Sequence, residues 1–364
     1  MADQTASSTV ERALNQHVMN LIDYAISHGA SDLHLIVGVP PVVRRDGKLL
    51  AIANEAPLTP EAAEEAITSI LLPEQKQEYL KERELDFSFG FRDMRFRVNT
   101  YFERAHMAAS LRLIPSQIPN LASLGLPAVL ERFTMPSQGF VIITGPTGHG
   151  KSTTLAALIQ HINETRSEHI VTIEDPIEYV FQHKRSMISQ REVGSDTSTF
   201  ASALRAVLRE DPNVILVGEM RDIETMEAAL TAAETGHLVF ATLHANSAEQ
   251  TTDRIVDAFP PHQQSQIRLQ LANVLLGVIS QRLIPRVQGG RIAAAEILTA
   301  NGAIRSLIRE GKTHQIGNVI KTSASDGMIN LDKVLADLVS KGEVTLDEAL
   351  VWADDPKQLK MSVY

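Results

Sequence analysis

The sequence contains no cysteine, and aromatic residues make up only 5% of it. The lack of cysteine excludes disulfide bonds, thiol nucleophiles and zinc sites built from cysteine, and it fits a reducing compartment. Basic residues are also in deficit, because 34 lysines and arginines face 44 aspartates and glutamates, for a formal charge of -10. An acidic chain with few aromatic side chains is a poor candidate for coating nucleic acid, so we expect no nucleic-acid partner.

Long apolar runs are missing as well. No stretch of the sequence approaches about 18 consecutive apolar residues, the length that a membrane-spanning helix requires. Residues 1–16 have neither the basic region nor the apolar region of a secretory signal. We therefore expect a cytoplasmic protein of two domains, since 364 residues are enough for two separate cores.

The first third of the chain has the pattern of an α+β domain. Apolar residues recur at helical spacing in residues 10–28, and a glutamate-rich helical pattern covers residues 60–81. Polar and apolar residues alternate at 31–35, 85–89, 94–98 and 111–113, as expected for antiparallel strands. A polar run with two prolines, residues 114–120, predicts a linker. We expect domains at 1–114 and 123–364, joined by a linker at 115–122.

The remainder of the chain has an α/β pattern. Short apolar runs at 140–144, 170–173, 214–217 and 238–243 alternate with longer helical stretches. Such runs are typical of a parallel sheet that is covered on both faces. Beyond Arg291 the pattern is mainly helical, most clearly at 303–310 and 331–340.

A phosphate-binding loop follows the first of these strands. The pattern G-x-x-x-x-G-K-[ST] is matched by Gly145, Pro146, Thr147, Gly148, His149, Gly150, Lys151 and Ser152, and Thr153 comes next. The glycines let backbone N–H groups surround phosphate oxygens, Lys151 reaches the β and γ phosphates, and Ser152 ligates Mg²⁺. His149 as a general base is the weaker interpretation, because its position in such a loop contributes mainly backbone. The sequence therefore predicts a site for ATP and Mg²⁺.

Acidic residues follow two of the other predicted strands. Glu174 and Glu219 lie where an α/β sheet places catalytic groups, at the carboxyl ends of strands. The usual NTPase motif has an aspartate directly after the second strand, but here that position is Gly218, so we expect Glu219 to serve the metal, the water or both. His237 and His244 lie at opposite ends of the strand 238–243, which argues against a shared metal. His244 is a candidate γ-phosphate sensor, with a structural histidine as the alternative.

These motifs together resemble a known family, the PilT-like type IV pilus retraction ATPases of the secretion-ATPase superfamily. The resemblance rests on GPTGHGKSTT, VTIEDPIEY, QREVGSDT, ALRAVLREDPNVILVGEMRD, AAETGHLVFATLHANSA and AIRSLIREG, with SDLHL and GVPPVVRRDGKL near the start. It implies an N-terminal PAS-like α+β domain, a RecA-like P-loop ATPase domain with a helical C-terminal part, and a homohexameric ring with ATP between subunits. It also implies that Glu174 is the catalytic glutamate, that Glu219 belongs to an atypical Walker B motif, and that His237 and His244 form the His box.

Within the superfamily, the lack of cysteine favours retraction ATPases, because the extension ATPases resemble longer chains with a tetracysteine zinc element. The stretch 303–310 resembles the retraction signature, with Ser306 in place of the usual asparagine, and its helix could present Arg305 and Arg309 together. The phosphate loop departs from the family at His149, where serine is usual. The C-terminal stretch also resembles the accessory retraction ATPases, so the sequence leaves the main and the accessory motor open.

The resemblance predicts an ATP-hydrolysing motor that powers pilus retraction and twitching motility, peripheral at the inner-membrane base of the pilus machine. Its expected partners are copies of itself, a membrane platform protein and a paralogous pilus ATPase. Arg95, Arg97 and Arg112 alternate with apolar residues, and we hypothesise that they approach ATP, some of them from the adjoining subunit. A solvated sheet face is the alternative for these arginines. A nucleic-acid translocase and a nucleotide-gated module without turnover are the alternative functions.

Overall fold

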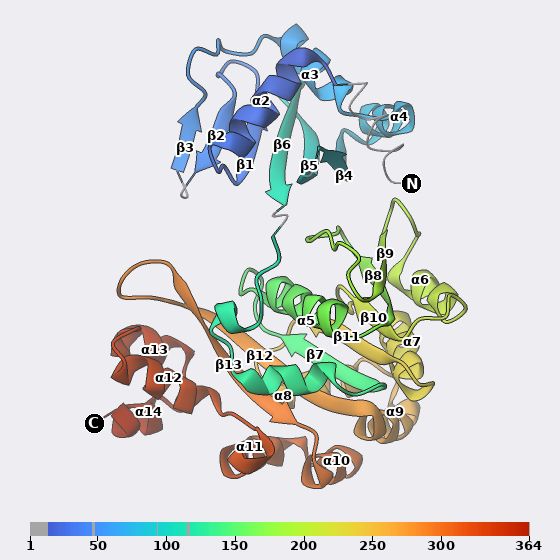
Figure 1. Ribbon diagram of the computed structural model, residues 1–364, viewed down its shortest axis with the longest axis vertical. Helices are drawn as coiled ribbons and strands as arrows, with labels where there is room; N and C mark the ends of the chain where they lie inside the picture. The colour runs from blue at the N-terminus through green and yellow to red at the C-terminus, as the bar shows by residue number, and fades with distance from the viewer. Residues whose placement is uncertain (1–13, 46–47, 93, 115–116, 364) are drawn as a thin grey trace. The chain divides into compact units, whose positions relative to one another are not determined.

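The computed structural model describes residues 14–45, 48–92, 94–114 and 117–363 (Figure 1). The chain divides into two compact units. The first contains the residues up to Gln117 together with Pro176–Val180, and the second contains Ile118–Asp175 and the residues from Phe181 onward. Residues 115–116 of the expected linker and residues 10–13 of the expected first helix lie outside the described residues.

The first unit is an antiparallel sheet with helices on one face (Figure 1). Its elements are α2 (Gln16–Ser27), β1 (Asp32–Leu35), β2 (Val42–Arg45), β3 (Lys48–Ala51), α3 (Pro60–Ser69), α4 (Pro73–Glu82), β4 (Glu84–Phe91), β5 (Met94–Glu103) and β6 (His106–Ile114). The strand order is β3-β2-β1-β6-β5-β4. The predicted alternation places Phe96 and Val98 in the core and leaves Arg97 exposed. The apolar face of the sheet packs on Leu21 and Ile22 of α2.

The second unit is built around a seven-stranded sheet. Its elements as far as the sheet extends are the 3-10 helices η1 (Ala122–Leu124) and η2 (Ala128–Thr134), β7 (Gly139–Thr144), α5 (Lys151–Thr165), β8 (His169–Glu174), β9 (Met187–Glu192), α6 (Phe200–Val207), β10 (Val214–Val217), α7 (Ile223–Glu234), β11 (Leu238–Leu243), α8 (Ala248–Asp257), α9 (Pro261–Val274), β12 (Leu275–Pro285) and β13 (Arg291–Thr299). The strand order is β13-β12-β7-β11-β10-β8-β9, and all neighbours are parallel except β12 and β13. The four predicted apolar strands are confirmed.

Both faces of this sheet are covered, which explains why its central strands are apolar throughout. Every residue of β7, β10 and β11 is buried. Helix α5 packs on one face, where it contacts β7 and β11. On the other face, Phe140 and Ile142 share a core with apolar residues of α6, α7, α8 and α9.

The segment after residue 291 begins with a strand, so the expectation of a mainly helical pattern is wrong for residues 291–299. Ala293, Ala294 and Ala295 have high helix propensity, but their backbone pairs in antiparallel register with Leu283, Arg282 and Gln281 of β12. Tertiary pairing and burial therefore override the local preference.

Helices follow β13, as predicted. They are α10 (Gly302–Arg309), the 3-10 helices η3 (Thr313–Gln315) and η4 (Ala324–Asp326), α11 (Ile316–Thr322), α12 (Leu331–Ser340), α13 (Leu346–Trp352) and α14 (Pro356–Val363). The last three form a small core with Ile284 of β12 and Ala294 of β13, and Leu335 and Leu359 lie at its centre. None of the helices in the described part of the chain has both the length and the apolar character to span a bilayer.

Candidate nucleotide-binding site

Four neighbouring parallel strands end at one edge of the second sheet. Strands β7, β11, β10 and β8 lie side by side in this order. Each is followed by a segment that contains a predicted site residue: the phosphate-binding loop after β7, His244 after β11, Glu219 after β10, and Glu174 at the end of β8. The topology therefore brings together groups that are separated by up to a hundred residues, at the edge where α/β sheets bind ligands.

The backbone of the phosphate-binding loop requires glycine. Gly148 and Gly150 have φ angles of 79° and 80°, in the left-handed region. At Gly145, where φ is 142°, a Cβ atom would lie 2.3 Å from the backbone oxygen of Gln281. The loop leads into α5, whose first residue is Lys151. The N–H groups at the start of this helix and its dipole make the loop a site for an anion.

Lys151 lies inside this loop with only 8% of its surface exposed. Its Nζ donates hydrogen bonds of 3.0 Å to the carbonyl oxygens of Gly145 and Pro146. A positive charge at a helix N-terminus opposes the helix dipole, so this position is favourable only when an anion or other oxygen atoms compensate for it. Ser152 and Thr153 follow in the first turn of α5 and are half-buried.

Glu174 is buried at the end of β8, and hydrogen bonds orient its carboxylate. Its Oε1 accepts from Thr172 Oγ1 at 2.7 Å and from Gln190 Nε2 at 3.2 Å. Gly218 lies beside it, because a Cβ at residue 218 would be 3.2 Å from the oxygen of Ile173 and 3.3 Å from Cα of Glu174. A larger residue there would crowd the β8 backbone at this glutamate. This close approach favours glycine at the position where the usual motif has an aspartate.

Glu219 lies between the side chains of Arg221 and His244. Arg221 forms an ion pair with its Oε1, and Nε2 of His244 lies 3.5 Å from its Oε2. His244 itself is exposed, and its backbone oxygen accepts a 2.8 Å hydrogen bond from Arg254. His237 precedes β11 at the opposite edge of the sheet, with Nδ1 2.9 Å from the oxygen of Ala232. These two histidines are therefore at opposite ends of the strand, as predicted.

Arg95, Arg97 and Arg112 belong to the first unit. Arg97 and Arg112 are cross-strand partners on β5 and β6, so their side chains share one face of the sheet. Nε of Arg112 donates a 2.9 Å hydrogen bond to Oδ1 of the buried Asp32. Arg95 is half-buried two residues before Arg97 on the same strand.

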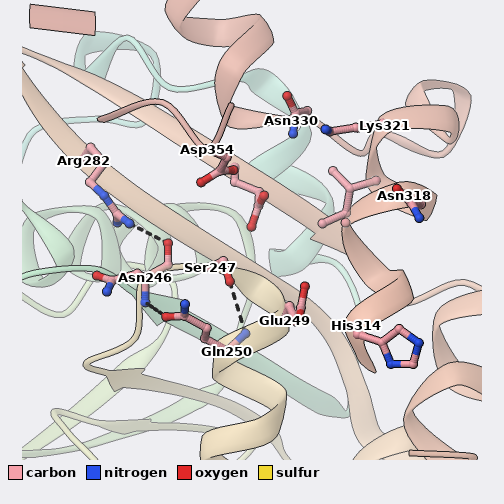
Figure 2. A pocket seen from close by; sticks show the side chains of 13 residues that line it. Asn246, Ser247, Glu249, Gln250, Arg282, His314, Asn318, Lys321, Asn330 and Asp354 are labelled. Carbon is pink, nitrogen blue, oxygen red and sulfur yellow. Dashed lines mark hydrogen bonds between the residues drawn. The ribbon is translucent and has the colours of Figure 1, made fainter. Parts of the chain in front are cut away.

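Sequence reasoning missed two polar residues of β12 that support the loops. Gln281 is 2% exposed; its Nε2 donates to the oxygen of His149 at 2.9 Å, and its Oε1 accepts from Thr154 Oγ1 at 2.7 Å. Arg282 donates to the backbone oxygen of Asn246, in the loop after β11 (Figure 2). The available signal was a polar Ser-Gln-Arg interruption in an apolar strand, because buried polar residues need partners.

A polar pocket of about 350 Å³ lies next to this loop (Figure 2). Asn246 and Ser247 line it directly before α8, Arg282 lines it from β12, and Asp354 lines it from the turn between α13 and α14. The buried Glu296 also lines the pocket and accepts a 2.8 Å hydrogen bond from the N–H of Ala248. Burial raises the pKa of Glu296 to about 7.

The donor atoms near the phosphate loop suit a magnesium ion. Ser152 offers a hydroxyl and Glu219 a carboxylate, and Mg²⁺ is usually held by one or two such oxygens together with substrate phosphates. The described residues contain no cluster of three His, Cys, Asp or Glu side chains that would hold a metal without a substrate.

Known proteins match this chain over nearly its full length. A model of the type II/IV secretion system protein family matches residues 4–350. The Pseudomonas aeruginosa protein named type IV pilus retractation ATPase PilT is 46% identical over 341 residues, which cover 93% of this chain and 99% of that protein. The type IV pilus ATPase PilU of the same organism is 38% identical over 345 residues, covering 94% of this chain and 90% of that protein.

The fold is similar to a solved structure as well. The crystal structure described as the pilus retraction motor PilT with bound ADP has a TM-score of 0.88 to this chain and 49% sequence identity, covering 93% of this chain and 98% of the other. Both kinds of comparison span the two units and the phosphate-binding loop. The chain therefore belongs to the type II/IV secretion system protein family, and within it to the pilus retraction ATPases.

Proposed function

We propose that this chain hydrolyses ATP to power the retraction of type IV pili, and thereby twitching motility. The observation that carries the proposal is the convergence of the phosphate-binding loop with two carboxylates, Glu174 and Glu219, at adjacent strand ends. The relation to PilT, whose solved structure is described as a retraction motor with bound ADP, supports both the nucleotide and the task.

In the mechanism that we propose, the loop and Lys151 bind the β and γ phosphates of ATP. Ser152 and Glu219 would hold Mg²⁺, and this ion would supply positive charge that compensates for the charge of these phosphates. Glu174 orients the attacking water and accepts its proton, because its carboxylate is fixed by Thr172 and Gln190. His244 senses the γ-phosphate and transmits its presence to Glu219, which lies 3.5 Å away.

We further propose the domain identities and the assembly that the resemblance implies: a PAS-like unit up to residue 114, a linker at 115–122, and a RecA-like unit from residue 123. In a homohexamer, Arg95, Arg97 and Arg112 would stabilise the phosphate charge of ATP, some of them from the adjoining subunit. Hydrolysis would then change how the units of neighbouring subunits contact each other, because ATP and ADP make different contacts.

The location that we propose is the cytoplasmic side of the inner membrane, at the base of the pilus machine. There the ring would act on a membrane platform protein and return pilin to the membrane. A paralogous pilus ATPase is a further expected partner, since the chain is related to both PilT and PilU.

The enzymatic part is tested by Glu174→Gln. This variant keeps the size and the hydrogen bonds of the side chain but cannot accept a proton, so it should bind ATP normally and release phosphate at least 100-fold more slowly. Glu227→Gln, which changes an exposed carboxylate on α7, is the matched control. Phosphate release by Glu174→Gln at the rate of the control would remove Glu174 from the role of base.

Action across subunits is tested with mixed rings. Arg97→Ala and Lys151→Ala are each expected to be inactive alone. If Arg97 acts on the nucleotide of its neighbour, a mixture contains sites with an intact loop and an intact arginine, and phosphate release should recover in part. Mixtures that stay as inactive as the single variants would argue against action across the interface.

The cellular task is tested by deleting the gene and counting surface pili. We expect more pili and loss of twitching, restored by the wild-type gene but not by Lys151→Ala. Cells without pili would instead indicate an extension motor.

A further inference from the structure

The single tryptophan of the sequence lies beside the phosphate-binding loop. Trp352 is the last residue of α13, and its ring meets the ring of His149 edge to face, with centroids 5.1 Å apart and planes at 63°. The guanidinium of Arg282 lies 6.0 Å from the centre of the same ring. An aromatic residue of the C-terminal helices therefore contacts both the phosphate-binding loop and the arginine that holds the loop after β11.

His149 is fixed to β12 by both its backbone and its side chain. Its Nδ1 accepts a 3.0 Å hydrogen bond from the N–H of Leu283, and its backbone oxygen accepts a 2.9 Å hydrogen bond from Gln281. An imidazole nitrogen that accepts a hydrogen bond carries no proton. The ring is thus in the neutral form with the proton on Nε2, and its orientation is set by the strand.

The charges around His149 favour this neutral form. Burial lowers its pKa, and the positive charges of Arg282, Arg291 and Lys151 lower it further. Arg291 also donates a 3.1 Å hydrogen bond to the oxygen of Gly148, so β13 holds the loop as well. Near neutral pH the hydrogen bond from Leu283 therefore remains intact.

Trp352 is held in place by its own helices. It packs on the small core that α12, α13 and α14 form with Ile284 and Ala294. The buried carboxylate of Asp332 accepts hydrogen bonds from the N–H groups of Asp354 at 2.8 Å and Asp355 at 3.0 Å, which fixes the turn directly after Trp352. The ring of Trp352 is therefore a direct contact between His149 of the phosphate-binding loop and the core of these helices.

We propose that His149 is a positioning residue of the phosphate-binding loop and that Trp352 couples the packing of α12, α13 and α14 to nucleotide binding. The coupling rests on the proposed binding of ATP by this loop. By linkage, helices that are displaced from the loop should weaken nucleotide binding, and bound nucleotide should hold the helices in place.

Intrinsic fluorescence tests the coupling directly, because all tryptophan emission of the full chain comes from Trp352. Addition of Mg²⁺ and ADP should change this emission saturably, with the same midpoint as ADP binding measured by equilibrium dialysis. Lys151→Ala, which should not bind ADP, should show no change. Binding of ADP in dialysis with unchanged emission would overturn the coupling. A wild-type chain that neither binds ADP nor releases phosphate would instead overturn the proposed function.

Substitutions of Trp352 give a second test. Trp352→Ala should raise the KM for ATP and the Kd of ADP about fivefold or more while kcat changes less than twofold, because the catalytic carboxylates are untouched. Trp352→Phe, which retains an aromatic ring against His149, should restore most of the affinity. The matched control is Val351→Ala, whose side chain on the same helix is 72% exposed.

The outcome that overturns the proposal here is a Trp352→Ala protein with the KM and Kd of the Val351→Ala control. A loss of kcat and affinity together, not restored by phenylalanine, would also overturn it, since that pattern indicates general damage to the fold. If the alanine variant does not fold, the fluorescence titration of the wild-type chain decides.

Discussion

Arg305 of the retraction signature is expected to stabilise the fold rather than to contact a partner. The sequence suggested that the helix could present Arg305 and Arg309 together, but in the structure only Arg309 is exposed, and the two side chains donate to different groups. The guanidinium of Arg305 donates to the backbone oxygens of Ala272 and Asn273 at the end of α9, the latter at 2.7 Å. It also donates to the oxygens of Leu275, directly after α9, at 2.8 Å and of Ala300, before α10, at 3.1 Å. Arg309 is exposed and donates only to Ser306 among the hydrogen bonds described.

The effect of Arg305→Ala follows from these four bonds. Carbonyls at the end of a helix lack partners within the helix, and a hydrogen bond to a charged donor contributes about 1.5–3 kcal/mol. Arg305 is only half-buried, so water replaces part of what is lost, and we expect the free energy of unfolding to fall by about 2–4 kcal/mol. For a unit of this size, that corresponds to a melting temperature lower by about 4–16 °C.

Thermal unfolding followed by circular dichroism, without nucleotide, measures this difference. Arg309→Ala is the matched control and should melt within about 2 °C of the wild-type chain, as exposed substitutions usually do. Arg305→Lys should fall between them, because one ammonium cannot reach four carbonyls. An Arg305→Ala protein that melts like the control but fails to retract pili would refute this reasoning and assign Arg305 a role outside the fold.

Two further predictions concern buried positions of the second unit. Gly145→Ala would force a Cβ against a backbone oxygen of β12. About 1–3 kcal/mol of strain should weaken ADP binding about 5- to 150-fold, measured by equilibrium dialysis. Gly317→Ala, which has open space at its Cβ, should bind ADP normally in the same assay. For Glu296, the folded-state pKa of about 7 lies above the ordinary value of 4.5, so the folded chain holds the proton more tightly than the unfolded chain. Stability should therefore fall as pH rises from about 4.5 to about 7, by at most about 1.4 kcal/mol per pH unit, and then level off. In urea unfolding across this range, the free energy of unfolding of Glu296→Gln should depend less on pH than that of the wild type, and at pH 8 it should be the larger of the two. A Glu296→Gln protein that is less stable than the wild type at pH 8 would contradict the raised pKa of Glu296.

Much of the nucleotide site was predictable from the sequence because its signals are local. A phosphate-binding loop needs glycines and a lysine at fixed spacing within eight residues. The strands that lead to Glu174 and Glu219 are predicted by their short runs of apolar residues. A prediction from local residue preference was wrong at residues 291–299, because three alanines there favour a helix but pairing with β12 imposes an extended backbone. In the sequence, Gly218 is only a departure from the usual motif, whereas the structure shows that the β8 backbone at Glu174 lies close enough to favour a residue without a Cβ.

Local patterns along the chain were sufficient to predict the order of the two units, the central strands and the phosphate-binding loop, because each depends on neighbouring residues. The polar residues that support these elements could be identified only in the folded chain. Gln281 reaches His149 across more than a hundred residues, Arg305 satisfies the end of a different helix, and Trp352 meets the phosphate-binding loop from the far end of the chain. Such contacts carry no periodic signal, since they are fixed by strand order and side-chain direction in three dimensions rather than by spacing along the backbone.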